Sequence, residues 1–513
     1  MIYDAILTGF MGVTTPLNLL LIAAGTTIGM FVGAMPGLSA TMAIALLLPL
    51  TFPLPTASGL SLLASLYMGA MYGGSIAAIL LRTPGTPAAA ATVLDGYPMA
   101  QNGQAGKALG VSLVASFIGG LISSVALMTL APLLGQVALQ FGPVELFAVA
   151  VLGLTIIASL SRGSTILGLL SGTIGALLAM VGMDNITGVP RFTFGSINLF
   201  GGISFIVALI GLFSIPQAIR LIEKKDDPKR KAVVNSISDR MLPTWTEFKG
   251  MFVTMVRSGF IGVFTGLIPG TGGDTACWFG YNEAKRFSKE KEKFGTGYPE
   301  GVAAAEAANN AVVGGSLIPT ISLGIPGSSS AAVLMGGLMV HGIMPGPTLM
   351  TEHADVTYIL IWAIMLANFG ILIVGMLMTR MSIYVTRIKD TIMAPMIIVL
   401  CVIGSFSINN SIFDVGLMLG FGLLGYVMDK LNIQTAPLVV GLILGNLLNV
   451  SLHQSLLISR GNWGIFVTTP ISAVLLAIAL ISILQCTPFF SWIPRLWNFR
   501  PKGNKRSISG PTE

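Results

Sequence analysis

A glycine–proline pattern that occurs twice is the feature that most constrains the fold of this chain. Residues 29–37 are GMFVGAMPG and residues 262–270 are GVFTGLIPG, so the frame Gly-x-x-x-Gly-x-x-Pro-Gly returns 233 positions later. A second pair follows: GGS and then TPGT at 73–86, and GGS and then IPGS at 314–328. Self-similarity at a fixed spacing indicates duplication. The pattern therefore predicts two related halves, each with its helices interrupted at two Pro-Gly pairs.

Composition places these halves in a membrane. Hydrophobic residues make up 53% of the 513 residues and charged residues only 10%, whereas soluble domains carry about 25% charged residues. Apolar runs near the ~20 residues that span hydrocarbon recur along the chain. The expected fold is an all-α polytopic membrane protein with about 12 spans, built from two inverted-topology repeats.

The remaining bulk properties exclude several classes of protein. The net charge of +7 comes from short loops and the C-terminal end, which suits a cytoplasmic membrane face and gives no case for nucleic acid. The three cysteines show no metal-binding spacing and imply no disulfide framework. The first residues lack a basic n-region and a clear cleavage site, so they predict a retained interfacial or membrane segment and not a signal peptide.

The apolar segments and their breaks predict the element order. Helices are expected at 17–35, 37–52, 57–81, 108–133, 144–160, 164–182, 199–219, 251–268, 273–286, 301–322, 328–341, 355–380, 391–405, 411–428, 436–450 and 464–486. The predicted division is a first membrane repeat (1–219), a charged cytoplasmic linker (220–249), a second membrane repeat (250–490) and a basic disordered tail (491–513).

Charge placement predicts how the two repeats are oriented. The linker and the loop 283–300 are both rich in lysine and arginine, so both should be cytoplasmic. The first-half counterpart of that loop, residues 51–58, has no charge. Equivalent loops of opposite charge character indicate repeats inserted in opposite orientations. Each Pro-Gly is either the tip of a re-entrant hairpin or an interruption in a full span, and we favour hairpin tips.

The breaks themselves predict a binding site. Interrupted backbone survives in a membrane only where protein buries it or where it lines a wet cavity. A hydroxyl follows each break within two residues (Ser39, Thr86, Thr271 and Ser328), and we expect each to cap the helix that follows. Helix N-termini that converge in this way favour anions. A lone Pro-Gly is commonly only a kink, but the duplicated positions favour a site. The predicted substrate-binding residues are Pro36, Gly37, Ser39, Arg82, Thr83, Pro84, Gly85, Thr86, Pro269, Gly270, Thr271, Pro326, Gly327, Ser328 and Ser329.

Ionisable and amide side chains near the breaks are candidates for ion coupling. Ionisable groups inside a membrane usually face a cavity or a partner, and hard cations prefer oxygen ligands. The candidates for binding Na⁺ or H⁺ are Asp274, Glu306, Asn309 and Asn310. Arg82 has the geometry to pair with a substrate carboxylate. For Arg82 and Glu306 an interfacial position or a structural ion pair is an equal alternative.

Short matches to nucleotide-binding motifs lack the sequence context that these motifs require. GFGLLG at 420–425 lies in an apolar helix without a βαβ unit, and Gly106-Lys107 lacks the rest of a P-loop. No nucleophile with an adjacent base is evident, and the three histidines show no metal spacing. We therefore predict no enzyme activity, no catalytic residue, no firm metal site and no cofactor beyond a coupling ion.

Several segments together resemble the large membrane subunit of the tripartite tricarboxylate transporter family. They are GAMPG (33–37), YGGSIAAILL (72–81), TPGTP (83–87), LDGYP (94–98), GLIPG (266–270), EAANNA (306–311), GGSLIPT (314–320), GIPGS (324–328) and HGIMPGP (341–347). The motifs are dense over 25–110 and 255–347, and their order makes the resemblance specific.

This resemblance implies a function and partners. A protein of this kind imports di- and tricarboxylates across a bacterial inner membrane as a multi-pass protein, driven by an ion gradient. Its partners would be a small four-helix membrane subunit and a periplasmic solute-binding protein. The alternatives are a stand-alone cation/carboxylate symporter, which needs no binding protein, and an anion channel, which needs a continuous pore.

Overall fold

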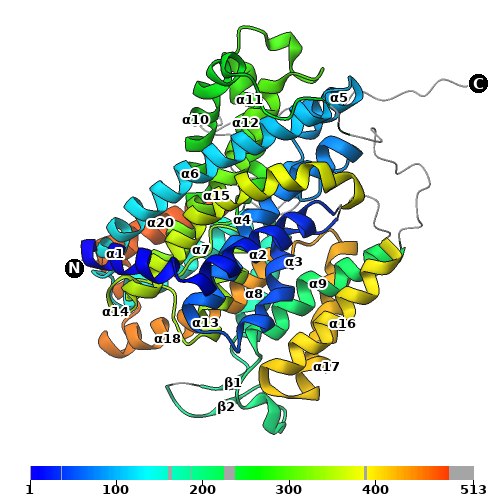
Figure 1. Ribbon diagram of the computed structural model, residues 1–513. Coiled ribbons are helices and arrows are strands. Elements are labelled where there is room, and N and C mark those ends of the chain that lie inside the picture. Colours follow the sequence, from blue (N-terminus) through cyan, green and yellow to red (C-terminus); the bar gives the residue numbers. More distant parts are fainter. Residues whose placement is uncertain are drawn as a thin grey trace, which may run out of the picture.

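A computed structural model describes residues 2–35, 37–159, 165–184, 186–223, 237, 239–385 and 390–484 (Figure 1). The α-helices are α1 (Ile2–Val13), α2 (Pro16–Gly33), α3 (Ala40–Leu47), α4 (Thr56–Leu81), α5 (Val93–Gln101), α6 (Ala105–Ala138), α7 (Pro143–Ser159), α8 (Thr165–Leu178), α9 (Phe205–Glu223), α10 (Trp245–Leu267), α11 (Gly272–Phe287), α12 (Pro299–Leu323), α13 (Ser329–Val340), α14 (Leu349–Glu352), α15 (Ala354–Val385), α16 (Asp390–Asn409), α17 (Ile412–Lys430), α18 (Ala436–Ile458), α19 (Ile465–Thr468) and α20 (Pro470–Leu484). Short 3₁₀ turns are η1 (Leu48–Thr51), η2 (Pro87–Ala89), η3 (Ile197–Leu199) and η4 (Lys291–Lys293), and β1 (Gly182–Met183) pairs with β2 (Pro190–Arg191) in an antiparallel ribbon.

The helices confirm the predicted all-α polytopic membrane fold. Within the described ranges, nine helices are long and apolar enough to cross a membrane, and six shorter apolar helices accompany them. The helix predicted at 57–81 is Thr56–Leu81, and the one predicted at 273–286 is Gly272–Phe287. The tail at 491–513 and linker residues 224–236 and 238 lie outside the described residues, and α10 begins a little before the predicted domain boundary at 250.

Small residues let the first helix of each hairpin pack backbone to backbone on the long helix that follows the hairpin, α2 on α4 and α10 on α12. A Cβ atom at Gly29 or Gly33 of α2 would collide with backbone oxygens of α4. In the second half, a Cβ at Gly266 of α10 would lie 2.7 Å from the backbone nitrogen of Ser316 on α12. Glycine at these positions therefore permits the close approach that is typical of membrane helix pairs.

The two halves repeat the same local fold at their second breaks. The Gly85 N–H donates to the Gly74 carbonyl (3.1 Å), and the Gly327 N–H donates to the Ser316 carbonyl (3.3 Å). After each break the chain therefore turns back beside the helix that it has just left.

The hairpins of the two halves enter from opposite faces of the molecule. The first-half hairpin α2–α3 has its ends beside the end of α13, because Thr51 contacts His341 across 3.3 Å (Oγ1 to Nε2). The second-half hairpin α10–α11 has its ends beside α5 and the start of α6, where Lys107 pairs with Glu247. In Figure 1, α5 and α11 lie at one end and the β ribbon at the other. We call the end with α5 and α11 the linker face (residues 101–107, 239–247 and 288–298). The opposite end, which includes residues 51–55 and 341–348, is the far face.

Asp95 ties the halves together at the linker face. Its Oδ1 accepts hydrogen bonds from the backbone N–H groups of Gly295 (2.9 Å), Gly297 (2.9 Å) and Tyr298 (2.8 Å), and its Oδ2 accepts one from the Tyr281 hydroxyl (2.9 Å). The side chain is completely buried. Asp95 near a predicted helix end looks like an ordinary interfacial charge in the sequence, but it anchors a loop of the other repeat.

A second carboxylate orders the β ribbon that lies toward the far face. Asp184 accepts hydrogen bonds from the Thr187 N–H (3.0 Å) and pairs with Arg191 (3.1 Å). Asn449 of α18 donates to the same carboxylate (3.2 Å). The hydrogen bonds from Thr187, helped by Asn449 and Arg191, lower the pKa of Asp184 to about 2. The ribbon is therefore held to α18 by an ionised carboxylate.

The remaining helices interlock the halves. The long helix α6 packs on α12 of the second half, and its counterpart α15 packs on α4 of the first. The last helix of the first half, α9, packs on α16 and α17, while α18 packs on α7 and α8. Each half thus completes its core with helices of the other half, which makes the repeats one structural unit.

Candidate functional site

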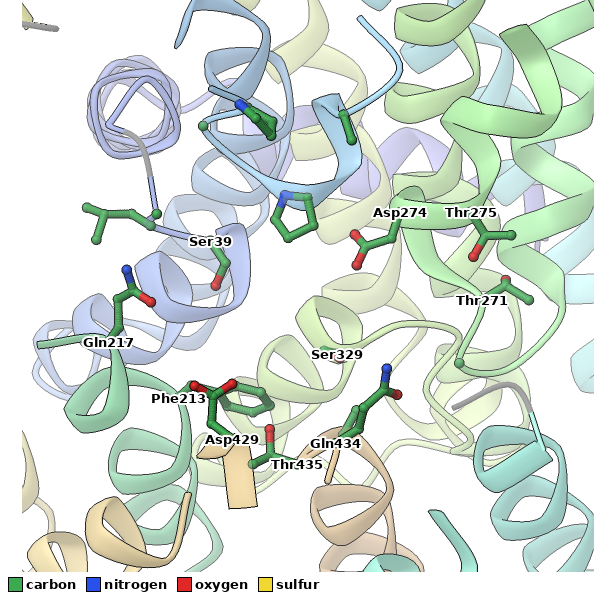
Figure 2. Close-up of a pocket in the computed structure, with 18 of the residues that line it drawn as sticks. Ser39, Phe213, Gln217, Thr271, Asp274, Thr275, Ser329, Asp429, Gln434 and Thr435 are labelled. Atoms are coloured by element: carbon green, nitrogen blue, oxygen red, sulfur yellow. The ribbon is translucent and has the colours of Figure 1, made fainter. Parts of the chain in front are cut away.

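Residues from all four breaks line one cavity of about 1780 Å³. The lining includes Gly37 from the first break, Gly85 from the second, Thr271 from the third and Ser329 from the fourth. Figure 2 shows side chains from three of these breaks, Ser39, Thr271 and Ser329, around the same space. The structure therefore brings together segments that lie up to almost 300 positions apart in the sequence (37 and 329).

The breaks are shaped by glycine. Gly37 and Gly270, which are equivalent in the two halves, both have positive φ angles (91° and 79°), a conformation that glycine adopts readily. The Gly270 N–H donates to the Gly327 carbonyl (3.0 Å), so the third break lies directly against the fourth. Pro36, the first residue of the predicted site, lies outside the described residues.

Only two of the four predicted caps form. Ser39 accepts a hydrogen bond from the Met42 N–H (3.1 Å), and Ser328 accepts one from the Ala331 N–H (3.1 Å). The prediction is wrong for Thr86, which precedes a 3₁₀ turn and whose buried hydroxyl has no partner. It is also wrong for Thr271, whose hydroxyl donates to the carbonyls of the preceding turn, among them Ile268 (2.9 Å).

The predicted residues divide into a lining set and a supporting set. Gly37, Ser39, Pro84, Gly85, Gly270, Thr271, Asp274 and Ser329 line the cavity. Pro269, Pro326, Gly327, Ser328 and Thr86 do not. Ser328 instead contacts the Tyr67 hydroxyl of the first half (3.0 Å), and Thr41 contacts Ser330 (2.9 Å), so this second layer joins the repeats behind the cavity.

Arg82 and Thr83 are not among the residues that line the cavity, and the predicted contact of Arg82 with a substrate carboxylate stays a prediction. Arg82 is the C-cap of α4 and has a left-handed conformation (φ 59°), the state that Gly324 adopts at the end of α12 (φ 71°). Its exposed side chain lies over the ring of Tyr97, 5.6 Å from the centroid. The chain reverses direction after Arg82, where the Gly85 N–H donates to the Gly74 carbonyl. Gly85 therefore lines the cavity, whereas Arg82 does not.

Polar residues that the sequence did not single out complete the lining. Gln217 of α9 lies against the first break, since a Cβ on Gly37 would be 2.8 Å from its amide nitrogen. Gln434 and Thr435 precede α18 and face the cavity from the opposite wall (Figure 2). The signal available in the sequence was a glutamine inside an apolar helix and a polar pair before Pro437.

One charged residue of the cavity lies beside the breaks, and the other four lie near its opening at the linker face. Asp274, in the first turn of α11, points into the cavity beside the breaks (Figure 2). The other charged lining residues form the pairs Arg220–Asp429 (3.4 Å) and Arg286–Glu283 (3.9 Å) near the ends of α9, α17 and α11 at the linker face. The side chain of Arg286 is 76% exposed, so the cavity reaches solvent at the linker face.

Glu306, Asn309 and Asn310 form a closed polar cluster behind the cavity. Glu306 is completely buried and accepts hydrogen bonds from Thr92 and Ser116 (the latter 3.3 Å). Asn309 donates to the Met71 carbonyl (3.2 Å) and Asn310 to Ser116 (2.8 Å), while the Oδ1 atoms of both asparagines have no hydrogen-bond partner.

This cluster adjoins the cavity wall without lining it. The Asn309 Oδ1 atom is 3.0 Å from the position of a Cβ on Gly273, which immediately precedes Asp274. The described residues hold no group of three or more histidine, cysteine, aspartate or glutamate side chains that could bind a metal. Any cation bound here would use amide and hydroxyl oxygens around a single carboxylate.

Two oppositely oriented repeats, whose interrupted helices meet at one cavity, define the class of membrane transporters built from inverted repeats. The family model "Tripartite tricarboxylate transporter TctA family" matches residues 19–440. The chain belongs to this family.

Two similar proteins come from Agrobacterium vitis. The chain is 36% identical over 476 residues to an uncharacterised 52.8 kDa protein of the TAR-I ttuC' 3' region, covering 93% of this chain and 94% of that protein. It is 35% identical over 223 residues to an uncharacterised protein of the TAR-II ttuC' 3' region, covering 44% and 92%. No solved structure matches the chain.

Proposed function

We propose that the chain is the cavity-forming subunit of a secondary active importer of di- and tricarboxylates in a bacterial inner membrane. The observation that carries the proposal is the meeting of all four helix breaks at one cavity. Family membership supports the carboxylate class of substrate. We propose no catalytic role for the chain.

Carboxylates would be held by backbone amides and hydroxyls. The helices α3, α11 and α13 begin at the cavity, and each N-terminus contributes roughly half a positive charge. Ser39 and Ser329 supply hydroxyls at the starts of α3 and α13, whereas the Thr271 hydroxyl donates to carbonyls of the preceding turn. The cationic side chains of the lining, Arg220 and Arg286, are paired with acids near the rim. An anion deep in the cavity would therefore be bound mainly by helix ends.

The coupling ion would bind at Asp274 and at the cluster of Glu306, Asn309 and Asn310. Asp274 is the acidic lining residue beside the breaks, so a cation there would offset its repulsion of the substrate. The unpartnered asparagine oxygens behind it are suitable ligands for Na⁺, and Glu306 is a suitable acceptor for H⁺.

Alternating access and two partners complete the proposal. The cavity reaches solvent at the linker face, and its lining includes no residue of the far-face segments 51–55 or 341–348. This one-sided opening favours a carrier over an anion channel. The partners would be a small four-helix membrane subunit and a periplasmic solute-binding protein. A stand-alone symporter is the alternative, and uptake by the purified chain alone would establish it.

The test is carboxylate uptake into liposomes that contain the purified chain with and without its partner subunits. We expect saturable uptake of citrate or a dicarboxylate that stops when both the Na⁺ and H⁺ gradients are collapsed. Asp274→Asn and Glu306→Gln should each abolish gradient dependence, whereas Glu292→Gln in the exposed linker-face loop should behave as wild type. Uptake that persists unchanged without either gradient would refute ion coupling.

A further inference from the structure

Arg257 is a cation in the apolar helix α10, and it has no acidic partner in the described part of the chain. Its buried Nε atom has no hydrogen-bond partner there. Glu300 reaches the same helix, but its oxygens accept hydrogen bonds from Thr254 (2.6 Å) and Ser288 (3.0 Å). An unpaired charge at this depth is costly and normally has a function or a partner.

The Arg257 side chain lies partway along an apolar groove on α10, between Phe252 and Phe264 in the sequence. It stacks on Phe287 at 4.7 Å from the ring centroid, and Arg286 approaches the same ring at 5.6 Å. The groove has a volume of about 530 Å³ and is lined, besides Arg257, by Phe252, Val253, Val256, Phe260, Ile261 and Phe264. Figure 1 shows α10 at the edge of the molecule, where lipid would surround it.

The depth of Arg257 fits a phosphate at the hydrocarbon boundary. Leu267, at the tip of the hairpin, is ten residues further along α10, which at 1.5 Å per residue is about 15 Å. On our proposal that the Pro-Gly breaks lie near the middle of the bilayer, Arg257 is about half of the ~30 Å hydrocarbon thickness away from them. Two guanidinium groups around one ring suit a phosphate, which Arg binds through paired hydrogen bonds.

We propose that this groove binds one anionic glycerophospholipid, with its phosphate at Arg257 and Arg286 and an acyl chain along Phe260 and Phe264. The apolar lining suits an acyl chain, and the buried Nε of Arg257, which has no hydrogen-bond partner among the described residues, suits the phosphate. Ile261 lines both the groove and the transport cavity, so the lipid would pack against the wall of the cavity.

Native mass spectrometry of the delipidated full chain with added phosphatidylglycerol tests the proposal. We expect wild type to retain one lipid and Arg257→Gln to bind it at least about tenfold more weakly, the effect of losing one charge-assisted contact. Val253→Trp, which fills the groove and keeps the charge, should also lose the lipid. Lys289→Gln removes a cation from the same face and should bind as wild type. Monodisperse elution and an unchanged unfolding temperature establish that each variant is folded.

Two probes and one cross-link separate the possible occupants. Diacylglycerol with the same chains should bind weakly, and inorganic phosphate should not compete. Equal binding by wild type and Arg257→Gln, or equal binding of diacylglycerol, would overturn the phosphate contact. Competition by inorganic phosphate would show a free-phosphate site instead. A membrane protein cross-linked through Val253 in place of lipid would assign the groove to a protein partner and overturn the proposal.

Discussion

Replacing Gly327 by alanine tests whether the fourth break needs its close backbone approach. A Cβ at this position would lie 2.5 Å from the Gly266 carbonyl oxygen and 2.6 Å from the Ser316 Cα. Both are backbone atoms, so no side chain can rotate away. Ordinary contact begins near 3.4 Å, so the break must shift by roughly 0.9 Å, and overpacking of this kind costs about 1–3 kcal/mol.

The shift would be transmitted to the cavity. The Gly327 carbonyl accepts the hydrogen bond from the Gly270 N–H (3.0 Å), so a displaced fourth break displaces the third. Because about 1 Å of misplacement can cost ~100-fold in a positioned site, we expect Gly327→Ala to lower carboxylate uptake at least tenfold. The assay is uptake in liposomes with both partners, together with reversible unfolding in detergent.

A matched glycine separates this effect from the substitution itself. Gly420 lies in α17 with no atom within 4 Å of a Cβ, so Gly420→Ala should leave uptake unchanged and add up to about 1 kcal/mol of stability. Gly85→Ala should resemble Gly327→Ala, since its Cβ would collide with the Gly33 carbonyl oxygen. Wild-type uptake and stability in Gly327→Ala would refute the reasoning.

Three further predictions address the caps, the repeat packing and the β ribbon. Ser328→Ala should destabilise the protein by about 1 kcal/mol in an unfolding titration, whereas Thr86→Val should be neutral or stabilising, because its buried hydroxyl has no partner. Cysteines at Thr41 and Ser330, whose oxygens are 2.9 Å apart, should form a disulfide that keeps the halves together after proteolysis of the linker. The folded-state pKa of Asp184 is lowered to about 2, so its contribution to stability is complete above about pH 4 and disappears as the pH falls toward 2; hydrogen exchange of the ribbon should increase over that window.

Each of these predictions has a control and a contrary result. Equal destabilisation by Ser328→Ala and Thr86→Val would mean that the cap is not what stabilises the fourth break. Cysteines at Thr27 and Ser330 should not cross-link, and failure of the Thr41 pair would place the halves differently. Asp184→Asn should remove the acid-dependent step in exchange, and an unchanged step would assign it to another group.

Much of the fold could be predicted because it depends on local signals. The span at Thr56–Leu81 follows from an apolar run bounded by Pro55 and the Pro-Gly at 84–85. The opposite orientation of the halves followed from the missing charge in 51–58, and the contacts Thr51–His341 and Lys107–Glu247 agree with it. These features could be predicted because hydrophobic length and loop charge act on each segment separately.

The parts of the site that could not be predicted from the sequence depend on tertiary packing. Thr86 has the same local pattern as Ser328, but its hydroxyl packs against Gly74 and the chain forms a 3₁₀ turn in place of an α-helix. Arg82 carries a side chain suited to a carboxylate, but its guanidinium lies over the ring of Tyr97 and is not part of the cavity lining. Gln217 of α9 and Gln434, which precedes α18, lie outside the repeated motifs, so no spacing in the sequence connects them to the breaks.

The one-sided cavity follows from a difference between equivalent helix pairs. In the first half, α3 packs directly on α9, and a Cβ on Gly37 would contact Gln217 there. The repeat spacing of 233 positions makes α11 and α18 the counterparts of α3 and α9 in the second half. Asp274 on α11 and Thr435 at the start of α18 instead lie on opposite sides of the cavity (Figure 2). Thus α3 and α9 pack on each other in the first repeat, whereas the cavity separates Asp274 of α11 from Thr435 before α18 in the second. Inverted repeats can exchange such states by rigid-body rocking of one element against the other, so the access change that we propose needs no helix to unfold.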